Sequence, residues 1–435
     1  MTLLKTKTNI IRTYAGYYRE DQALKSSSSG GVATYIAKVI VGDGGVVYGA
    51  TYADDFYSAH YLRVSNIKDI DRLKGSKYCF VRKVILKNGQ EKSVYEAVAE
   101  DVTEGRKILF IGLSCDIAAL LHYLESKSIP EFREMIFTIE LLCMGVTEEI
   151  VQREYVRYIE SLHKSKVKSF TVRSKRDGWN PIYINAKFEN EEEHVMPFYE
   201  STYGLAFMFY KRRACYKCEL KGKHRYADLT IGDYRGCEEW MPEFNRDGVS
   251  IIFVQTENGQ KMIDGIDFKI FKIMETDTEY ACRHSPRYFS ALPENPEWEE
   301  INRSINSVSG LFGTFRKRNY LFEYGESFVG KDIVLWGAGD CFHKLGHYVM
   351  EFTDVSFVVD ENPDIWSQYT EYGIKCMSPE HIRGKDVFVI IMIEAGNFVC
   401  QVINRLINMN IYSFAHVRDW IEFNERIKSN HTREP

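Results

Sequence analysis

Two apolar runs in the first half of the chain are each followed by a segment with helical periodicity. Residues 107–111 have the pattern of a buried strand, and residues 116–125 carry apolar side chains at the spacing of an amphipathic helix. Residues 136–142 form a second buried strand, followed by a helical stretch over 147–163. Strands that alternate with helices predict an α/β fold containing parallel strands.

Cysteines follow both predicted strands. Cys115 and Cys143 fall just beyond the C-terminal ends of the two strands, and open α/β sheets bind their ligands outside that edge. A C-x2-C pair, Cys215 and Cys218, lies further along the chain between basic flanks. Two thiolates at this spacing can bind one metal ion or one edge of an iron–sulfur cluster.

The spacing alone leaves several interpretations of these cysteines open. A zinc site needs two more nitrogen or sulfur ligands, and the sequence has no second C-x2-C or H-x3-H pair. A thioredoxin-type redox pair would begin a helix after a strand, and the basic flanks are not typical of one. Cys115 and Cys143 could join the pair around a [4Fe–4S] cluster, or could be buried small hydrophobic residues.

Length, charge and apolar runs limit the class of protein. The 435 residues predict two or three domains, and a net charge of −5 argues against a broad nucleic-acid surface. The longest apolar stretch, residues 387–393, is far shorter than the ~18 residues of a membrane helix. Residues 1–18 lack the pattern of a signal peptide, so we expect a cytoplasmic location and mostly reduced cysteines.

The C-terminal hundred residues have the pattern of a small doubly wound domain. Gly337 and Gly339 form a turn between a predicted strand, 332–336, and a helix, 340–351. Asp360 ends the next predicted strand, in the position that binds a ribose hydroxyl in dinucleotide-binding units. The third glycine of that pattern is absent, because position 342 is Phe. The segment resembles Rossmann-like modules of polysaccharide-biosynthesis proteins, which implies a bound nucleotide or nucleotide sugar. A docking domain that binds no nucleotide is the alternative.

Several short motifs occur in an order that resembles one known family. They are Ser27–Gly31, Gly75–Tyr78, Gly112–Asp116, Cys143–Val146, Arg173 with Gly178 and Trp179, Cys215–Cys218, and Ala227–Asp233. This order resembles the beta subunits of coenzyme F-420 hydrogenase/dehydrogenase, over roughly residues 13–290. Members of that family are flavin- and iron–sulfur-dependent oxidoreductase subunits, and many bacterial members resemble parts of surface-polysaccharide biosynthesis clusters.

The resemblance implies one [4Fe–4S] cluster held by Cys115, Cys143, Cys215 and Cys218. It also implies FAD or FMN, with its phosphate at the N-terminus of a helix that begins near Gly31, because such a terminus offers free N–H groups. The residues expected to bind the flavin are Ser28, Ser29, Gly30, Gly31, Ser76, Lys77, Arg173 and Asp233. Alternatively, these residues could serve as a helix cap, a surface turn, a charge at a strand edge and a turn cap.

The sequence also departs from the family pattern. No cysteine precedes Cys79, so the usual ferredoxin-like module with C-x2-C-x2-C-x3-C runs is absent, and the family's C-H-G-V reads Cys143-Met144-Gly145-Val146. We therefore expect electrons to come from a separate ferredoxin-like carrier. The basic residues expected to dock it are Lys211, Arg212, Arg213, Lys217, Lys221 and Lys223.

These observations predict an α/β protein with three parts. A mixed-sheet flavin and iron–sulfur region spans 13–292, a linker with a helix near 310–323 spans 293–330, and a Rossmann-like domain spans 331–435. The predicted function is a ferredoxin-linked oxidoreductase that acts on a small organic or sugar substrate in surface-polysaccharide biosynthesis. The alternative is a non-catalytic scaffold protein of the same machinery with a degenerate redox domain.

Overall fold

The computed structural model describes residues 9–87, 89–222, 225–295, 298–305, 328, 330–394, 396–409, 411, 413–418, 420, 421 and 424. The contacts divide the chain into two compact units. The first contains the described residues up to Val195 together with Phe209–Glu300, and the second contains Met196–Met208 together with those from Ile301 onward. The helix expected near residues 310–323 and the basic residue at position 223 lie outside the described residues.

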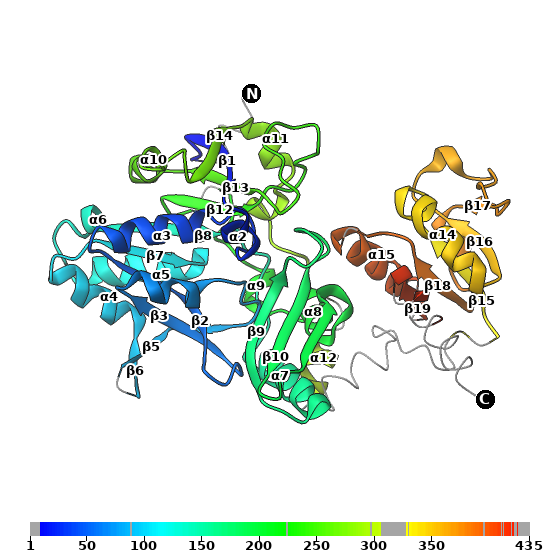
Figure 1. Cartoon of the computed structure of the whole chain (residues 1–435), viewed down its shortest axis with the longest axis horizontal. Helices are drawn as coiled ribbons and strands as arrows, with labels where there is room; N and C mark the ends of the chain where they lie inside the picture. The colour runs from blue at the N-terminus through cyan, green and yellow to red at the C-terminus, as the bar shows by residue number, and fades with distance from the viewer. Residues whose placement is uncertain are drawn as a thin grey trace. The chain divides into compact units, whose positions relative to one another are not determined.

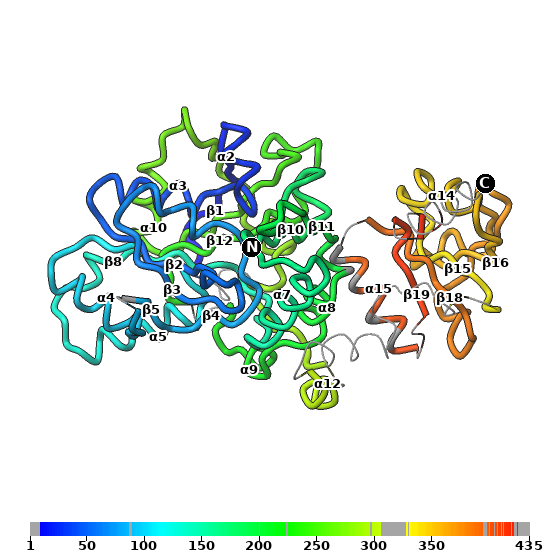
Figure 2. Tube along the Cα trace, turned by 60° about the horizontal axis from the view of Figure 1, so that its bottom comes forward, coloured from blue at the N-terminus to red at the C-terminus, as the bar shows by residue number. Residues whose placement is uncertain are grey.

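The first unit is built on a mixed sheet of nine strands in the order β14-β1-β13-β12-β8-β7-β2-β3-β4. Its strands are β1 (Arg12–Tyr18), β2 (Val46–Tyr52), β3 (Ala59–Val64), β4 (Val81–Arg82), β7 (Ile108–Gly112), β8 (Ile136–Leu141), β12 (Leu229–Asp233), β13 (Ser250–Val254) and β14 (Phe271–Glu275). Strands β2, β7, β8 and β12 run parallel, whereas β13, β1 and β14 continue the sheet antiparallel. The N-terminal strand β1 therefore lies among strands that come more than 230 residues later (Figures 1 and 2).

Helices cover both faces of this sheet. On one face α3 (Val32–Gly42) and α10 (Glu257–Asp264) share a core with inward-facing strand residues such as Val47. On the other face α4 (Val94–Thr103) and α5 (Ser114–Ser126) pack on the alternate residues of the same strands (Figure 1). The alternation of strand side chains places each apolar residue in one core or the other. The predicted mixed α/β class is confirmed.

Smaller elements complete residues 21–304, of which Met196–Met208 and Ile301–Ser304 belong to the second unit. They are α2 (Asp21–Lys25), η1 (Ile67–Leu73), β5 (Val84–Lys87), β6 (Gln90–Ser93), α6 (Phe132–Met135), α7 (Glu149–His163), β9 (Val167–Ser174), β10 (Tyr183–Phe188), β11 (Glu193–Pro197), η2 (Phe198–Glu200), α8 (Thr202–Phe209), α9 (Arg213–Tyr216), α11 (Thr278–Arg283), η3 (Pro286–Tyr288) and α12 (Trp298–Ser304). Strands β11, β10 and β9 form a separate sheet in that order, and β5 pairs with β6 as a hairpin.

The second unit contains a parallel sheet of five strands in the order β17-β16-β15-β18-β19. Its elements are β15 (Asp332–Trp336), α14 (Asp340–Phe352), β16 (Val355–Val359), η5 (Pro363–Ile365), β17 (Cys376–Met377), η6 (Pro379–Ile382), β18 (Val387–Ile391), α15 (Gly396–Asn408) and β19 (Phe414–His416). The first strand in sequence lies at the centre, and the order reverses on either side of it, as in doubly wound folds. Across the described residues, no helix is long and apolar enough to cross a membrane.

Candidate functional site

Four loops from distant parts of the sequence meet at one edge of the large sheet. The parallel strands β7, β8 and β12 end there, so Cys115 at the start of α5 and the loops that contain Cys143 and Arg235 lie on the same side. Strand β13 begins at this edge, where Ser250 pairs with both Asp233 and the end of β1. Because β1 ends beside Ser250, the loop that follows β1 also lies at this edge. The arrangement agrees with the rule that ligands bind beyond the C-terminal ends of parallel strands.

Gly145 brings two of the predicted cluster ligands together. Its N–H donates to Cys143 Sγ at 3.1 Å. A Cβ at this glycine would lie 3.7 Å from Cys215 Sγ and 2.7 Å from the side chain of Lys211. Its φ of 93° falls in the left-handed region that favours glycine. Position 145 therefore allows the loop after β8 to pass directly against the C-x2-C segment.

Cys115 and Cys218 complete the predicted set. Cys115 is the second residue of α5 and is exposed, and Cys218 lies two residues after α9 and is half-buried. Partial removal from water and then the Asp116 carboxylate raise the pKa of the Cys115 thiol to about 12. Cys143 and Cys215 are the smaller causes of the same upward shift in the pKa of Cys115.

The local charges also match thiolate ligands. Burial raises the pKa of Cys143, whereas the Lys221 ammonium and the Gly145 N–H oppose that shift. Lys221 Nζ also donates to the Cys143 carbonyl oxygen at 2.6 Å. Within the part of the chain that the structure describes, no three His, Cys, Asp or Glu side chains lie close enough to share one metal ion. A four-iron cluster spreads its thiolates more widely, at ~6–7 Å from one another.

A buried ion pair lies beneath Cys115, and sequence reasoning did not find it. Glu140 on β8 pairs with Arg225, and both side chains are fully buried. Ser114 Oγ donates to Glu140 Oε1 at 2.6 Å, and Arg225 Nη2 donates to the Tyr288 carbonyl oxygen at 2.7 Å. The glutamate inside the apolar run 136–142 was the available signal. This pair connects β8 to the residue that precedes Cys115.

The residues expected to bind flavin also come together. Ser76 Oγ lies 3.3 Å from Ser28 Oγ, which joins two of the predicted segments. Arg173 at the end of β9 forms a 2.7 Å ion pair with Asp233 at the end of β12. The pKa of Asp233 is low, because this ion pair outweighs the effect of burial, and the Ser29 hydroxyl adds to the shift.

Two buried hydrogen-bond donors in this region have no acceptor among the described residues. They are Nε of Arg173 and Nε1 of Trp179. The Arg173 guanidinium lies 5.6 Å from the centroid of the Trp179 ring, so the two donors are close to each other. Arg173 also has a φ of 71°, which is uncommon for a residue other than glycine. Because buried donors are nearly always paired, these two indicate a site for an acceptor group of a ligand.

Other predicted flavin contacts already have partners within the protein. The Gly30 N–H donates to Ser250 Oγ at 3.0 Å, and Ser29 Oγ donates to the Val249 carbonyl oxygen at 2.9 Å instead of capping α3. Lys77 Nζ donates to three carbonyl oxygens of its own turn, at residues 73–75. Gly31, with a φ of 91°, is the N-cap of α3. A Cβ at Gly30 would lie 2.0 Å from the Gly16 carbonyl oxygen, so close packing requires glycine there whatever the loop binds.

The structure corrects part of the expected docking surface. Lys211 is fully buried, so its inclusion among the exposed docking residues was wrong. Arg212 pairs with Glu148 at 3.2 Å, and Arg213 pairs with acidic residues near α12. Lys217 is exposed. Arg212 and Arg213 are therefore compensated by acidic residues of the protein, whereas Lys221 donates to two carbonyl oxygens.

The glycine turn after β15 is tight and hydrogen-bonded to Asp360. Gly337 has a φ of 110°, and a Cβ at Gly339 would meet no described atom within 4 Å. Asp360 Oδ2 accepts from the Ala338 N–H at 2.7 Å, and Oδ1 accepts from the Asn362 N–H at 2.8 Å. The predicted turn and acid are thus adjacent at the C-terminal ends of β15 and β16.

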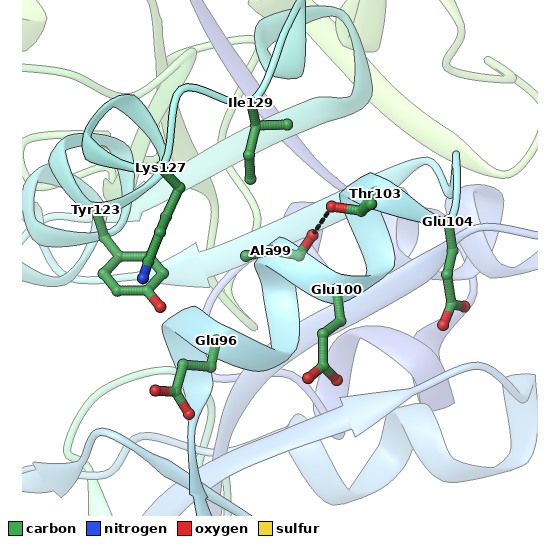
Figure 3. A pocket seen from close by; sticks show the side chains of 8 residues that line it. All are labelled: Glu96, Ala99, Glu100, Thr103, Glu104, Tyr123, Lys127 and Ile129. Carbon is green, nitrogen blue, oxygen red and sulfur yellow. Dashed lines mark hydrogen bonds between the residues drawn. The ribbon is translucent and has the colours of Figure 1, made fainter.

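A surface groove of about 480 Å³ lies between α4 and α5, away from all of these residues (Figure 3). Glu96 and Glu100 belong to α4, Glu104 follows its last residue, and Tyr123 belongs to α5. Glu100 is paired with Lys92. None of the predicted site residues lines this groove.

The fold and the loops at the sheet edge define a mixed α/β protein with a parallel-stranded second unit. Residues 105–278 match the family described as the C terminus of the coenzyme F420 hydrogenase/dehydrogenase beta subunit. This match confirms the resemblance read from the ordered motifs, and the matched segment contains all four candidate cluster cysteines.

One solved structure with a similar chain is titled as a xenon derivative of the F420-reducing [NiFe] hydrogenase complex from Methanosarcina barkeri. The similarity has 15% sequence identity and a TM-score of 0.42, and it covers 72% of this chain and 94% of the other. No curated protein matches the sequence.

Proposed function

We propose that the first unit is a flavin- and [4Fe–4S]-dependent oxidoreductase subunit. The observation that carries this proposal is the meeting of two residue sets at one sheet edge. The cysteine loops after β7 and β8 lie beside the C-x2-C segment, and the Arg173–Asp233 pair lies at the end of the neighbouring strand β12. The match of residues 105–278 to a hydrogenase/dehydrogenase family supports the same class of activity.

The cysteine environment fits an iron–sulfur cluster. Cys115, Cys143, Cys215 and Cys218 would hold it, and the Gly145 N–H already points at one of the sulfurs. Hydrogen bonds to cluster sulfurs and nearby positive charge set the reduction potential of such groups. Lys221, bonded to the Cys143 carbonyl, supplies a positive charge of that kind.

The pocket around Arg173 fits a flavin or its substrate. A bound flavin would supply hydride exchange with an organic substrate and single-electron exchange with a cluster. The protein would contribute the two donors that have no acceptor among the described residues, Arg173 Nε and Trp179 Nε1, as fixed partners for an acceptor atom. Ser28 and Ser76 would offer hydroxyl groups from two loops that already touch.

Electrons would come from a separate ferredoxin-like carrier, since the sequence contains no ferredoxin-type cysteine run. Lys217 is the exposed basic residue that lies between the two cysteines of the C-x2-C pair. A carrier with an acidic surface would be steered toward it. The substrate would be a small organic or sugar compound of surface-polysaccharide biosynthesis, a proposal that rests on the resemblance to bacterial family members.

The second unit would bind a nucleotide or nucleotide sugar. Its strand order and the adjacency of the Gly337–Gly339 turn to Asp360 support this function. Because a side chain at Gly339 would meet no described protein atom, Gly339→Asp should fold normally and repel a phosphate. Binding of UDP-glucose and of NADH to wild type and variant, measured by calorimetry, tests the site. Wild type that binds neither compound would favour a docking domain.

Metal and flavin analysis of anaerobically purified protein tests the redox proposal. Wild type should contain about four iron atoms and four sulfides per chain, and should release a flavin on denaturation. Cys143→Ser should lose most of the iron. The matched control is Cys237→Ser, a half-buried cysteine outside the set, which should keep it. Colourless wild-type protein without iron or flavin would favour the scaffold alternative.

A further inference from the structure

Two arginines near Met144 have no carboxylate partner among the described residues. Arg235 follows β12, and its Nη2 lies 3.8 Å from Met144 Sδ. Arg287 belongs to η3 and donates to the Ala291 carbonyl oxygen at 2.9 Å. Both side chains are half-buried, and of the residues that the structure describes, none offers either guanidinium a carboxylate oxygen within 4 Å. The described part of the protein therefore leaves both charges uncompensated.

The two guanidinium groups repel each other. Burial and, second, the Arg235 charge lower the pKa of Arg287. Arginine stays protonated in proteins, so both positive charges persist in this half-buried region. The carboxylate that Arg235 influences is Asp233, and this group is already engaged with Arg173 at 2.7 Å. Partly buried like charges cost free energy unless an anion joins them.

The two arginines adjoin residues of both proposed cofactor sites, by sequence or by hydrogen bonding. Met144 directly follows Cys143, and Arg235 comes two residues after Asp233. Lys221 Nζ fixes the backbone of this region, because it donates to the carbonyl oxygens of both Cys143 and Arg287. A molecule held by the two arginines would thus lie next to the residues that we propose for the cluster and the flavin.

We infer that Arg235 and Arg287 form a binding subsite for an oxyanion of the substrate, a carboxylate or a phosphate. This inference rests on the proposed function and names the class of substrate. Guanidinium groups bind both oxyanions through paired N–H donors. Met144 has no proton to donate. The subsite would therefore bind an anion by its charge, and the side chain at position 144 would not transfer a proton to it.

Calorimetry on the anaerobically purified full chain tests the subsite with two probes, inorganic phosphate and malonate. Wild type should bind at least one probe in low salt, and Arg235→Gln and Arg287→Gln should each weaken that binding about tenfold or more. The matched control is Arg283→Gln, an exposed arginine on the neighbouring α11, which should bind like wild type. Preference for phosphate or for malonate identifies the oxyanion.

Iron and flavin contents of the same samples distinguish other roles for the arginines. We expect both contents to be unchanged in the two variants. Equal probe affinity in wild type and Arg235→Gln, or no binding of either probe, would overturn the subsite. Loss of iron in the variants would show that the arginines stabilise the cluster rather than bind substrate. Release of flavin by added phosphate would show that they bind the flavin instead. Probe binding by protein that lacks iron and flavin would support the subsite while refuting the redox proposal.

Discussion

At the scale of single residues, the site depends on positions where the backbone must approach a side chain. Gly145 is the clearest example, because its N–H donates to Cys143 Sγ and a Cβ at this position would lie 3.7 Å from Cys215 Sγ. The sequence motif contained this glycine, but the reason for it required the structure. Lys211 and Cys215 lie close to residue 145 although they are about 70 residues away in the sequence. No local sequence pattern predicts a contact over that separation.

Gly145→Ala should reduce iron content and lower the melting temperature. The substitution adds strain at a φ of 93° and places Cβ 2.7 Å from Lys211, for a total cost of ~2–3 kcal/mol. Iron analysis and thermal unfolding measure both effects. Gly44→Ala is the matched control, because it has a similar φ of 81° and no described atom within 4 Å of a Cβ. Equal losses in both variants would show that strain alone matters at position 145.

At the scale of secondary-structure elements, buried polar pairs decide how the strands present their loops. Glu140 and Arg225 are both fully buried, and the Arg225 guanidinium also lies 4.0 Å from the ring of Tyr288. A buried pair of this kind is weak evidence for stability but is costly to break. It holds β8 against the segment that follows the cysteine pair.

Removing one partner of this pair should destabilise the protein more than removing both. Glu140→Leu should cost ~3–5 kcal/mol of unfolding free energy, since it leaves Arg225 charged and buried. The double variant with Glu140→Leu and Arg225→Met should cost less than Glu140→Leu alone, and therefore less than the sum of the single variants. Urea denaturation of the four proteins measures the coupling. Additive losses would mean that the two residues act independently.

A histidine pair at the edge of the small β9–β10–β11 sheet should make stability depend on pH. Burial first, and the neighbouring His163 second, lower the pKa of His194 to about 4. The unfolded chain binds a proton near pH 6.5 while the folded chain does not, so stability should fall from pH 6.5 toward pH 4. The loss should reach ~2 kcal/mol after allowance for partial exposure.

Thermal unfolding between pH 7 and pH 4 checks this prediction. His194→Gln should lose less stability over that range than wild type does. His122→Gln, a substitution of an exposed histidine, should behave like wild type. His416, with a pKa lowered by burial to about 4, is present in all three proteins and cancels in the comparison. Parallel pH profiles for wild type and His194→Gln would contradict the account.

At the scale of the whole molecule, the sequence predicted some levels of structure better than others. The strands 107–111 and 136–142 and the C-terminal alternation of strands and helices were predictable, because hydrophobic periodicity is local. The antiparallel half of the large sheet was not, since β1 pairs with strands at residues 250–275 and such pairing has no local signal. The cysteine set was proposed from motif order and stays a prediction, whereas no sequence motif pointed to Arg235 and Arg287.

The division into two units explains how one chain can carry two separate binding sites. Each unit has its own parallel strands and its own loops at their C-terminal ends, so two binding functions can be built in one chain. The predicted boundaries at residues 292 and 330 stay predictions. The proposed redox chemistry involves only the first unit, and the proposed nucleotide site only the second.

Anomalous diffraction at the iron edge, from anaerobically grown crystals, tests the central claim most directly. The account predicts one compact iron peak beyond the C-terminal ends of β7 and β8, with Cys115, Cys143, Cys215 and Cys218 as its protein ligands. A peak bound by other residues, or crystals of wild-type protein with no iron peak at all, would contradict it.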